Sequence, residues 1–424
     1  MADQLQRFLS LLQKLSQHFP EARDPGSHCF QKKRLRGTCR GGEIFDMSIT
    51  SQQLQKLHRE APLTDVHGHP SLKAFLFNRN LWRHYCSGSV FNPFASRTDF
   101  KMLEKGGLQV QWLAHYLPER QLFKQCFWFR LAAFLATPAY FKMTRGSLMN
   151  RLLQMMDRME REINRKPDRT ELARSVADIQ RIHEQGKIAF IHTVEGAHVL
   201  EGNLENLTTL AQRGVALLTL AHFFYNGLVP QVNAIPKNFL INKICKYDFM
   251  ARGHPELSDF GTEVVRKMHE LRMIIDVSHC TPEARAAIFA ENQAAQPIVA
   301  THVGVHKINP DPYNLENEEI QEIVHSQGAV GVIFMNYWLD PRDPKKGLDA
   351  LWRTIEHLHQ VTQSWDYIML GTDFDGFTDP PDDVKDTSQL PSVTRMLLER
   401  GLSEVEIKKI LGANAMRVLK AGWK

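Results

Sequence analysis

Histidine and carboxylate side chains recur directly after short apolar runs in this 424-residue sequence. His67 and His69 lie two residues apart on an extended segment, so both side chains leave the same face of the chain. Two imidazoles placed in this way can hold one cation at metal–nitrogen distances of about 2.0–2.1 Å. His279 and His302 follow two later apolar runs and can hold a second cation. Glu195 has two carboxylate oxygens and can bridge the two ions, so the pattern predicts a pair of metal sites.

Each of these residues also has an ordinary structural interpretation when it is taken alone. A single histidine at a strand end is usually a hydrogen-bonded structural residue. Glu195 could cap a helix, and Asp373 could begin a turn. Coincidence becomes a weak explanation only if all of these side chains share one edge of one fold. On that condition we predict two divalent metal ions. Neutral imidazole with carboxylate favours Zn2+, with manganese, cobalt or iron as alternatives.

The apolar runs have the length of buried parallel strands, and helical or loop segments separate them. They span residues 62–66, 108–113, 188–191, 215–220, 273–277, 297–300, 329–334 and 367–370. Helical patterns lie between them at 172–185, 204–213, 260–271 and 282–292. Eight strands, each followed by a helix or a long loop, predict an α/β fold of the (β/α)8 TIM barrel type. The active site of such a barrel forms at the C-terminal ends of the strands, where the histidines and carboxylates stand.

Two regions lie outside this regular alternation. Residues 1–60 are expected to form an N-terminal extension, with a helix over 5–19 and a solvated connecting segment, and residues 61–424 the barrel. Between the second and third runs the chain is longer than a crossover needs. It contains a helical pattern over 148–164 and an aromatic-rich insert at about 117–145. An insert after a barrel strand lies on the catalytic face, so it forms a lid or pocket wall, or else a dimer interface.

The composition excludes several classes of protein. The net charge of +5 is too small for this length to indicate a nucleic-acid partner. The most apolar stretch, 131–141, is interrupted by Pro138 and is too short to cross a bilayer, and no signal peptide is evident. The six cysteines include no C-x-x-C pair, which favours a reduced protein without a disulfide framework. We therefore expect a cytoplasmic protein with a small-molecule substrate, no nucleic-acid or membrane partner, and a homodimer as one option.

Five motifs follow one another in a consistent order along the chain. They are VEGAH at 194–198, LTLAH at 218–222, DFG at 259–261, MIIDVSH at 273–279 and GTDFDG at 371–376. Together they resemble the renal (membrane) dipeptidase family of the amidohydrolase superfamily of metal-dependent barrels. The resemblance covers about residues 61–420 and leaves out the first 60 residues and the insert.

The resemblance implies two zinc ions and assigns the side chains around them. Its metal ligands correspond to His67 and His69 on the first ion, His279 and His302 on the second, and Glu195 between them. Asp373 matches the acid/base aspartate beside the first metal. His222 matches a histidine that contacts the substrate carbonyl.

Two positions depart from the family pattern. The family usually has an aspartate where this chain has His69, and the imidazole removes one negative charge beside the first metal, which makes that ion a stronger Lewis acid. Tyr313 stands where the family has an arginine that holds the C-terminal carboxylate of the substrate. A tyrosine cannot supply a bidentate charged clamp, so we expect Tyr313 to line the substrate site with an altered specificity.

These observations predict a zinc-dependent, dipeptidase-like hydrolase that cleaves the amide bond of dipeptides or dipeptide-like small substrates. In the expected mechanism the two metals share a hydroxide, Asp373 takes its proton, and His222 helps to stabilise the oxyanion. One alternative is the same barrel acting on an acyl amide, a lactone or a phosphoester. Another alternative is a non-catalytic barrel that binds metal.

Overall fold

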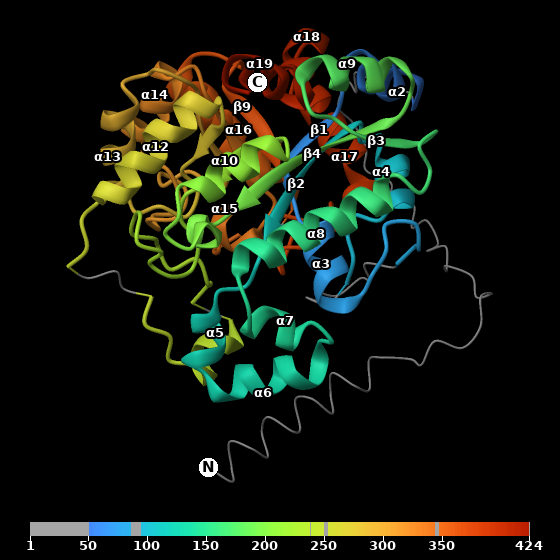
Figure 1. Ribbon diagram of the computed structural model, residues 1–424. Helices are drawn as coiled ribbons and strands as arrows, with labels where there is room; N and C mark the ends of the chain where they lie inside the picture. The colour runs from blue at the N-terminus through green and yellow to red at the C-terminus, as the bar shows by residue number, and fades with distance from the viewer. Residues whose placement is uncertain (1–50, 86–94, 238, 250–252, 344–346, 424) are drawn as a thin grey trace. The chain divides into compact units, whose positions relative to one another are not determined.

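The computed structural model describes residues 51–85, 95–237, 239–249, 253–343 and 347–423. Within them, eight parallel strands form a nearly closed barrel (Figure 1). The strands, in their order around it, are β1 (Thr64–Gly68), β2 (Val110–Tyr116), β4 (Ile188–Glu195), β5 (Val215–Thr219), β6 (Ile274–Asp276), β7 (Ile298–Val303), β8 (Ala329–Ile333) and β9 (Ile368–Gly371). A parallel bridge between Gly68 and Phe374 links the last strand to the first. The predicted TIM barrel is confirmed, and every predicted run overlaps one strand.

The barrel strands have no solvent-facing side, because every residue in the eight strands is buried. Their inner side chains fill the barrel and their outer side chains pack under helices, which is why they can be recognised as continuous apolar runs. The three-residue strand β3 (Thr170–Leu172) pairs only with β4 and lies off the barrel. It is not among the predicted strands because it falls at the edge of a helical pattern.

The described helices form the outer layer of the barrel and, over residues 120–146, a separate insert. They are α2 (Ser51–Glu60), α3 (Pro70–Phe77), α4 (Phe100–Gly106), α5 (Arg120–Lys124), α6 (Phe127–Ala136), α7 (Tyr140–Thr144), α8 (Leu148–Ile163), α9 (Val176–Glu184), α10 (Glu205–Gln212), α11 (Leu240–Ile244), α12 (Asp259–Leu271), α13 (Pro282–Asn292), α14 (Asn317–His325), α15 (Asn336–Leu339), α16 (Leu348–Thr362), α17 (Pro391–Glu399), α18 (Glu404–Lys408) and α19 (Asn414–Gly422). Several begin at a side-chain cap. Thr281, for example, accepts a hydrogen bond from the amide of Ala284 just before α13.

Two glycines allow the backbone to pass closely around Thr301 on β7. A Cβ atom added to Gly331 would lie 1.9 Å from the carbonyl oxygen of Thr301, and one added to Gly371 would lie 1.8 Å from it. The obstructing atom is backbone, so it cannot move aside. These close approaches hold Thr301, and with it the neighbouring His302, at a fixed place on the inner side of the barrel.

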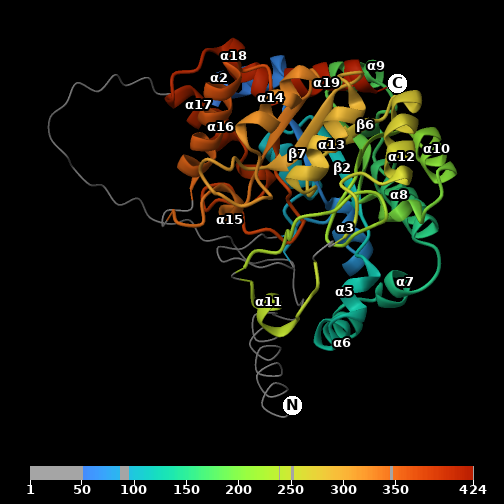
Figure 2. The same cartoon turned by 90° about the vertical axis from the view of Figure 1, so that its left-hand side faces the viewer.

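Helices α5, α6 and α7 form a protrusion that we call the α5–α7 insert (residues 120–146). Figures 1 and 2 both place it at the end of the barrel opposite α18 and α19. It follows the C-terminal end of β2, so it stands on the catalytic face of the barrel. Helix α6 contains no buried residue. The insert therefore leaves α6 on the surface of the molecule.

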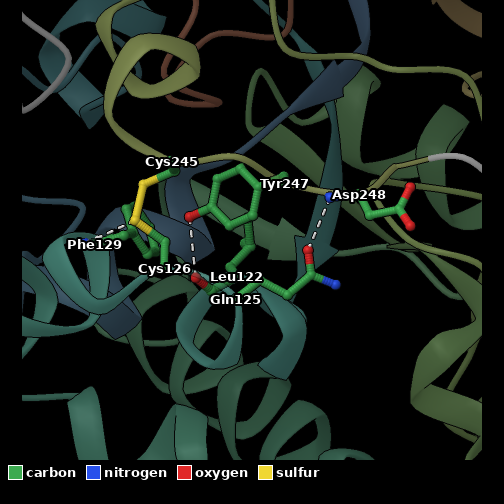
Figure 3. Close-up of a disulfide and its surroundings, with 7 residues drawn as sticks. All are labelled: Leu122, Gln125, Cys126, Phe129, Cys245, Tyr247 and Asp248. Carbon is green, nitrogen blue, oxygen red and sulfur yellow. Dashed lines mark hydrogen bonds between the residues drawn. A yellow bond between two sulfur atoms is a disulfide. The ribbon is translucent and has the colours of Figure 1, made fainter.

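A disulfide between Cys126 and Cys245 joins the start of α6 to the segment after α11, which lies 119 residues further along the chain (Figure 3). Beside it, the hydroxyl of Tyr247 donates a hydrogen bond to the carbonyl oxygen of Leu122 at 3.0 Å. The expectation of unpaired cysteines is wrong for this pair, because the sequence spacing of two distant cysteines does not show that the fold brings them together. Cys280 is free and buried; Cys29, Cys39 and Cys86 lie outside the described residues.

The first described helix, α2, packs on the C-terminal helices. Lys56 forms an ion pair of 3.4 Å with Glu404, and His58 Nε2 lies 2.8 Å from the hydroxyl of Thr394. The helix predicted over 5–19 and the connecting segment after it lie outside the described residues. None of the described helices is long and apolar enough to cross a membrane.

Candidate active site

Seven of the eight side chains predicted for the site meet at the C-terminal ends of the barrel strands. Their ligand atoms form three overlapping groups, and within each group the atoms lie within 4.8 Å of one another. The groups are His67–His69–Asp373, His67–Glu195–His302 and Glu195–His222–His279. His67 lies in β1 and His69 directly follows that strand, β4 ends in Glu195, and the other side chains stand at or just after the ends of β5, β6, β7 and β9.

Glu195 lies at the centre of the cluster and is 2% exposed. Its Oε1 atom lies 3.2 Å from His67 Nε2, 3.2 Å from His279 Nε2 and 3.3 Å from His302 Nε2. Its Oε2 atom lies 3.5 Å from His69 Nε2. The carboxylate therefore stands between two histidine pairs, one that begins on β1 and one from β6 and β7.

The spacing of the ligand atoms fits bound cations. The Nε2 atoms of His67 and His69 are 3.1 Å apart, and those of His279 and His302 are 2.9 Å apart. Tetrahedral ligands at 2.0–2.1 Å from a zinc ion stand roughly 3.3 Å from one another. The distance between the two nitrogens of each pair is thus close to that between two ligands of one ion. The carboxylate of Glu195 is near enough to both pairs to be a shared ligand.

Thr301 fixes which nitrogen of two histidines faces the cluster. Its hydroxyl donates to Asp276 Oδ2 at 2.7 Å, so its oxygen is left to accept hydrogen bonds. His67 Nδ1 lies 3.0 Å from that oxygen and His302 Nδ1 lies 2.8 Å from it. Both Nδ1 atoms therefore carry protons, and both Nε2 atoms keep lone pairs directed at the cluster. This is the tautomer that a metal-binding histidine needs.

Burial and charge act in opposite directions on the ligands. Burial opposes ionisation of Glu195, but His222, His67 and His69 surround it and hold its pKa well below its usual range. Burial, together with the charge of the neighbouring His302, lowers the pKa of His67 to about 4. Burial opposes the charged form of His69, but Glu195 and Asp373 outweigh it and raise the pKa of His69 to about 8. A carboxylate surrounded by imidazoles is the donor set that divalent transition metals bind.

Asp373 lies beside the first histidine pair. Its Oδ1 atom is 3.1 Å from His69 Nε2, and its side chain is 13% exposed, the most open position in the cluster. Burial raises the pKa of Asp373, but hydrogen bonding to His69 and the nearby imidazole charges outweigh it and lower the pKa below the usual value. The backbone of Asp373 has a φ of +53°, an uncommon conformation for a residue other than glycine. The carboxylate is therefore held at the opening of the site.

His222 is oriented by a buried carboxylate that sequence reasoning missed. Glu119, 2% exposed, lies with Oε1 at 3.0 Å from His222 Nδ1. The backbone amide of Phe223 donates to the same oxygen at 2.9 Å, and the hydroxyl of Tyr116 donates to Oε2. Burial would raise the pKa of Glu119, but His222 and His198 outweigh it and bring that pKa to about 2. Glu119 is thus an anion that holds His222 through Nδ1 and leaves Nε2 facing Glu195 at 3.6 Å.

Tyr313 occupies a different position from the other predicted residues. It is 1% exposed, and its hydroxyl donates to the backbone carbonyl of His302 at 3.0 Å. Its ring stacks on Trp338 at a centroid distance of 4.2 Å and meets His279 edge-on at 5.3 Å. The side chain therefore packs behind the histidines of the second pair, and its hydroxyl is engaged with the backbone.

A model of the membrane dipeptidase family, peptidase family M19, matches residues 51–422. The chain belongs to the membrane dipeptidase family. Membership of a peptidase family makes it a hydrolase. The match includes every residue of the cluster described above and also the insert.

Curated relatives are similar to this member of the membrane dipeptidase family at moderate identity. The chain is 28% identical over 274 residues to the dipeptidase tcpJ of Claviceps purpurea, a match that covers 64% of this chain and 60% of that protein. It is 24% identical over 382 residues to the dipeptidase ataJ of Aspergillus terreus, covering 86% of each chain. Both of these relatives are dipeptidases by name.

Solved structures of the family share the fold. The probable dipeptidase PvdM of Pseudomonas aeruginosa superimposes with a TM-score of 0.71 at 20% identity, covering 87% of this chain and 97% of that one. A metallopeptidase of Rhodobacter sphaeroides, solved with a phosphinate mimic of the dipeptide L-Ala-D-Ala, gives a TM-score of 0.66 at 20% identity, covering 86% and 99%. At this identity the similarity shows the fold alone.

Proposed function

We propose that the protein is a binuclear metal hydrolase that cleaves the amide bond of a dipeptide or a dipeptide-like small substrate. The observation that carries the proposal is the position of Glu195 between the two histidine pairs, with its oxygens 3.2–3.5 Å from four Nε2 atoms. Membership of the membrane dipeptidase family supports the reaction type.

Two divalent cations, Zn2+ first among them, suit these ligands. His67 and His69 would hold one and His279 and His302 the other, with Glu195 shared. When bound, such cations lower the pKa of water towards about 7 and polarise a carbonyl oxygen, which is the chemistry that amide hydrolysis requires.

Asp373 would move the proton. Its carboxylate lies at the opening of the cluster, where it can accept a proton from the attacking water and deliver it to the nitrogen of the leaving amine. The amide C–N bond breaks as that nitrogen is protonated, and the acyl carbon keeps the oxygen of the water as a carboxylate. The low pKa of Asp373 keeps it ionised, and therefore ready to accept the proton, at neutral pH.

His222 would stabilise the carbonyl oxygen as negative charge develops on it. Its Nδ1 atom is held by Glu119 at 3.0 Å, so the ring presents Nε2 to the site. A donor at Nε2 aimed at a developing oxyanion is worth about 3–4 kcal/mol in other enzymes. Glu119 acts through His222 and is a positioning residue in this scheme.

Tyr313 favours a second candidate, in which the same barrel hydrolyses an uncharged acyl amide or a lactone. The tyrosine hydroxyl is bonded to the backbone of His302, so it does not replace a charged clamp for a substrate carboxylate. The cytoplasmic location expected from the sequence stays a prediction. The Cys126–Cys245 disulfide weighs against it, because disulfides persist mainly in oxidising compartments.

The test is amine release by zinc-reconstituted protein from three matched dipeptides, with a free, an amidated and a D-configured C-terminal residue. Faster hydrolysis of a free-carboxylate dipeptide supports the dipeptidase proposal. Equal rates, or turnover of the amide alone, support the second candidate. If none of the dipeptides nor a panel of acyl amides and lactones is turned over by protein that contains two metal ions per chain, the hydrolase proposal is wrong.

A further inference from the structure

The α5–α7 insert has the most apolar surface among the described residues. Four of the five large apolar side chains that are exposed there belong to it: Phe127 (57%), Phe134 (49%), Leu135 (65%) and Phe141 (51%). The fifth, Val405, lies on α18. Helix α6 has the sequence FWFRLAAFLA and no fully buried residue. Phe129 and Ala133 pack against the core, whereas Phe127, Phe134 and Leu135 are exposed, so one side of the helix is covered by the described part of the chain and the other is not. Exposed apolar patches of this kind mark sites of interaction.

The exposed rings are close to one another. Phe134 packs edge-on against Phe141 of α7, with ring centroids 6.0 Å apart, and against Tyr140 at 5.4 Å. Phe127 lies seven residues before Phe134, so both rings project from the same side of α6. The exposed apolar side chains of α6 and α7 therefore form one continuous surface.

All the charges on the insert have the same sign. Residues 120–146 contain five basic side chains and no aspartate or glutamate, although the whole chain has 47 acidic residues. The basic residues are Arg120, Lys124, Arg130, Lys142 and Arg145. Two of them lie beside the exposed rings: the guanidinium of Arg130 is 5.5 Å from the centre of the Phe127 ring, and that of Arg145 is 4.9 Å from the centre of the Phe141 ring. The partner of this surface must therefore be apolar and negatively charged.

The insert is attached firmly to the barrel at its base. Leu122, Phe123 and Met143 are buried, and the disulfide from Cys126 ties the start of α6 to the segment after α11 (Figure 3). Below α6, the backbone amide of Asp248 donates to Gln125 Oε1 at 3.0 Å. These contacts hold α6 in place before it binds a partner. Less conformational entropy is therefore lost when its exposed rings dock.

We propose that the α5–α7 insert docks on a membrane surface that carries anionic phospholipid headgroups. Phe, Trp and Leu on a short helix flanked by Lys and Arg are suited to the boundary between headgroups and acyl chains, where rings enter the apolar region and cations meet phosphates. The ten residues of α6 are too few to cross a bilayer, so the contact lies in the plane of the surface. Because the insert follows β2 on the catalytic face, the mouth of the site would face the lipid.

Other occupants fit the charges less well. A second copy joined through the same patch would set basic residues against basic residues, since a two-fold contact pairs a surface with itself. Residues 1–48 contain eight basic and five acidic residues, so they too carry net positive charge. A nucleic acid would match the sign, but the alanine and leucine side chains of α6 offer it no hydrogen bonds. The expectation of no membrane partner stays the rival prediction, and the following experiment decides between them.

The test is flotation of the full chain with vesicles of phosphatidylcholine alone and of phosphatidylcholine with phosphatidylserine. We expect binding to the anionic vesicles only, with release when ionic strength rises from about 0.1 M to about 1 M, where the screening length falls from about 10 Å to 3 Å. The double variants Phe134→Ser/Leu135→Ser and Arg130→Glu/Lys142→Glu should each weaken binding at least about tenfold. All of these positions are exposed and outside the catalytic cluster, so hydrolysis of a soluble substrate should not change.

Matched controls keep the test specific to the insert. Val405→Ser removes an exposed apolar side chain elsewhere, and Lys101→Glu/Lys105→Glu reverses two exposed charges on α4; neither should change binding. Absence of binding to both vesicles would overturn the proposal, as would equal loss in the controls. Displacement by an oligonucleotide, or a dimer in sedimentation that the insert variants dissociate, would assign the surface to a nucleic acid or to a second copy instead. None of these readouts depends on catalysis.

Discussion

At the strand ends around Glu195, charged and polar side chains are almost completely buried, whereas on α6 large apolar side chains are exposed. His67 and Glu195 are 1% and 2% exposed, and Phe134 and Leu135 are 49% and 65% exposed. Both regions reverse the usual distribution of residues in a folded protein. They stand at the same end of one barrel, one inside its mouth and one on the insert beside it.

The buried polar groups and the exposed apolar side chains differ in the contacts that stabilise them. Buried charges are costly unless they are paired, and in the cluster each carboxylate faces imidazoles at 3.0–3.6 Å. The exposed rings of α6 and α7 contact neighbouring aromatic rings and two guanidinium groups, and one side of each ring remains open to solvent. The polar groups of the site are therefore largely satisfied within the chain, whereas we propose that the insert surface is covered by a membrane outside it.

The largest expected effect comes from a substitution of Asp373 in the buried cluster. Asp373→Asn should lower kcat by about a thousandfold or more, because the amide cannot accept the proton from water, while metal content stays at two per chain. Steady-state hydrolysis of a dipeptide, with metal analysis of the same samples, measures both quantities. Turnover close to that of the unaltered protein would remove Asp373 from the mechanism.

The disulfide tests how the exposed region is held. Cys126→Ser/Cys245→Ser should lower the free energy of unfolding by about 2–4 kcal/mol, because the unfolded chain is then no longer a closed loop. Hydrolysis of a soluble dipeptide should change little, since neither cysteine touches the cluster. Urea unfolding with and without reductant provides the control: reductant should destabilise the parent protein and leave the variant unchanged. Equal sensitivity to reductant in both proteins would contradict this account.

Glu119 lies between the two regions, just before α5. Its substitution tests whether this residue belongs functionally to the catalytic cluster or to the insert. Glu119→Gln should reduce kcat about tenfold to a hundredfold with unchanged metal content, because His222 loses the anion that orients it. Glu119→Asp should recover part of the loss. Glu201→Gln removes a carboxylate that accepts from Ser147 at the end of the insert and should leave kcat unchanged. A change in KM alone for Glu119→Gln would contradict the positioning role.

The smallest effect concerns a buried imidazole remote from the cluster. Burial lowers the pKa of His58 to about 4, below the ordinary 6.5. Between these values the unfolded chain binds the proton more readily, so the stability that neutral His58 contributes is present above pH 6.5 and is lost as the pH falls towards 4. Relative to His58→Gln, the parent protein should lose about 1–2 kcal/mol more between pH 7 and pH 5. The exposed His325→Gln is the control, and kcat should be the same in all three proteins.

Much of the barrel can be predicted because its strands are buried on both sides and are therefore visible as apolar runs. The ligands could be predicted because they stand at the ends of those runs, where the fold brings them together. Thr301 and Asp276 also stand at strand ends, but their roles depend on which hydrogen bond each donates, and this needs coordinates. Tyr313 is expected from the sequence to line the substrate site, but its hydroxyl donates to the backbone of His302. A position in a sequence motif does not determine the direction of a side chain.

Glu119 is missed because the predicted second strand stops at residue 113, whereas β2 continues to Tyr116. With the longer strand, a carboxylate three residues after its end would have been a candidate. His115 interrupts the apolar pattern after residue 113, so the predicted run ends before the strand does. The Cys126–Cys245 pair could not be found in this way, since loop closure over such a distance leaves no local signal.

The disulfide also changes the covalent topology of the chain. Residues 126–245 form a closed ring that contains α6 to α11 together with β3, β4 and β5. A protease that cuts once anywhere in this ring does not divide the molecule, because the two ends remain joined through sulfur. Two fragments separate only when the bond is reduced, and the barrel strand that carries Glu195 cannot be released by one cut alone. A nicked molecule would therefore keep the same mass, apart from one added water, until reductant is present.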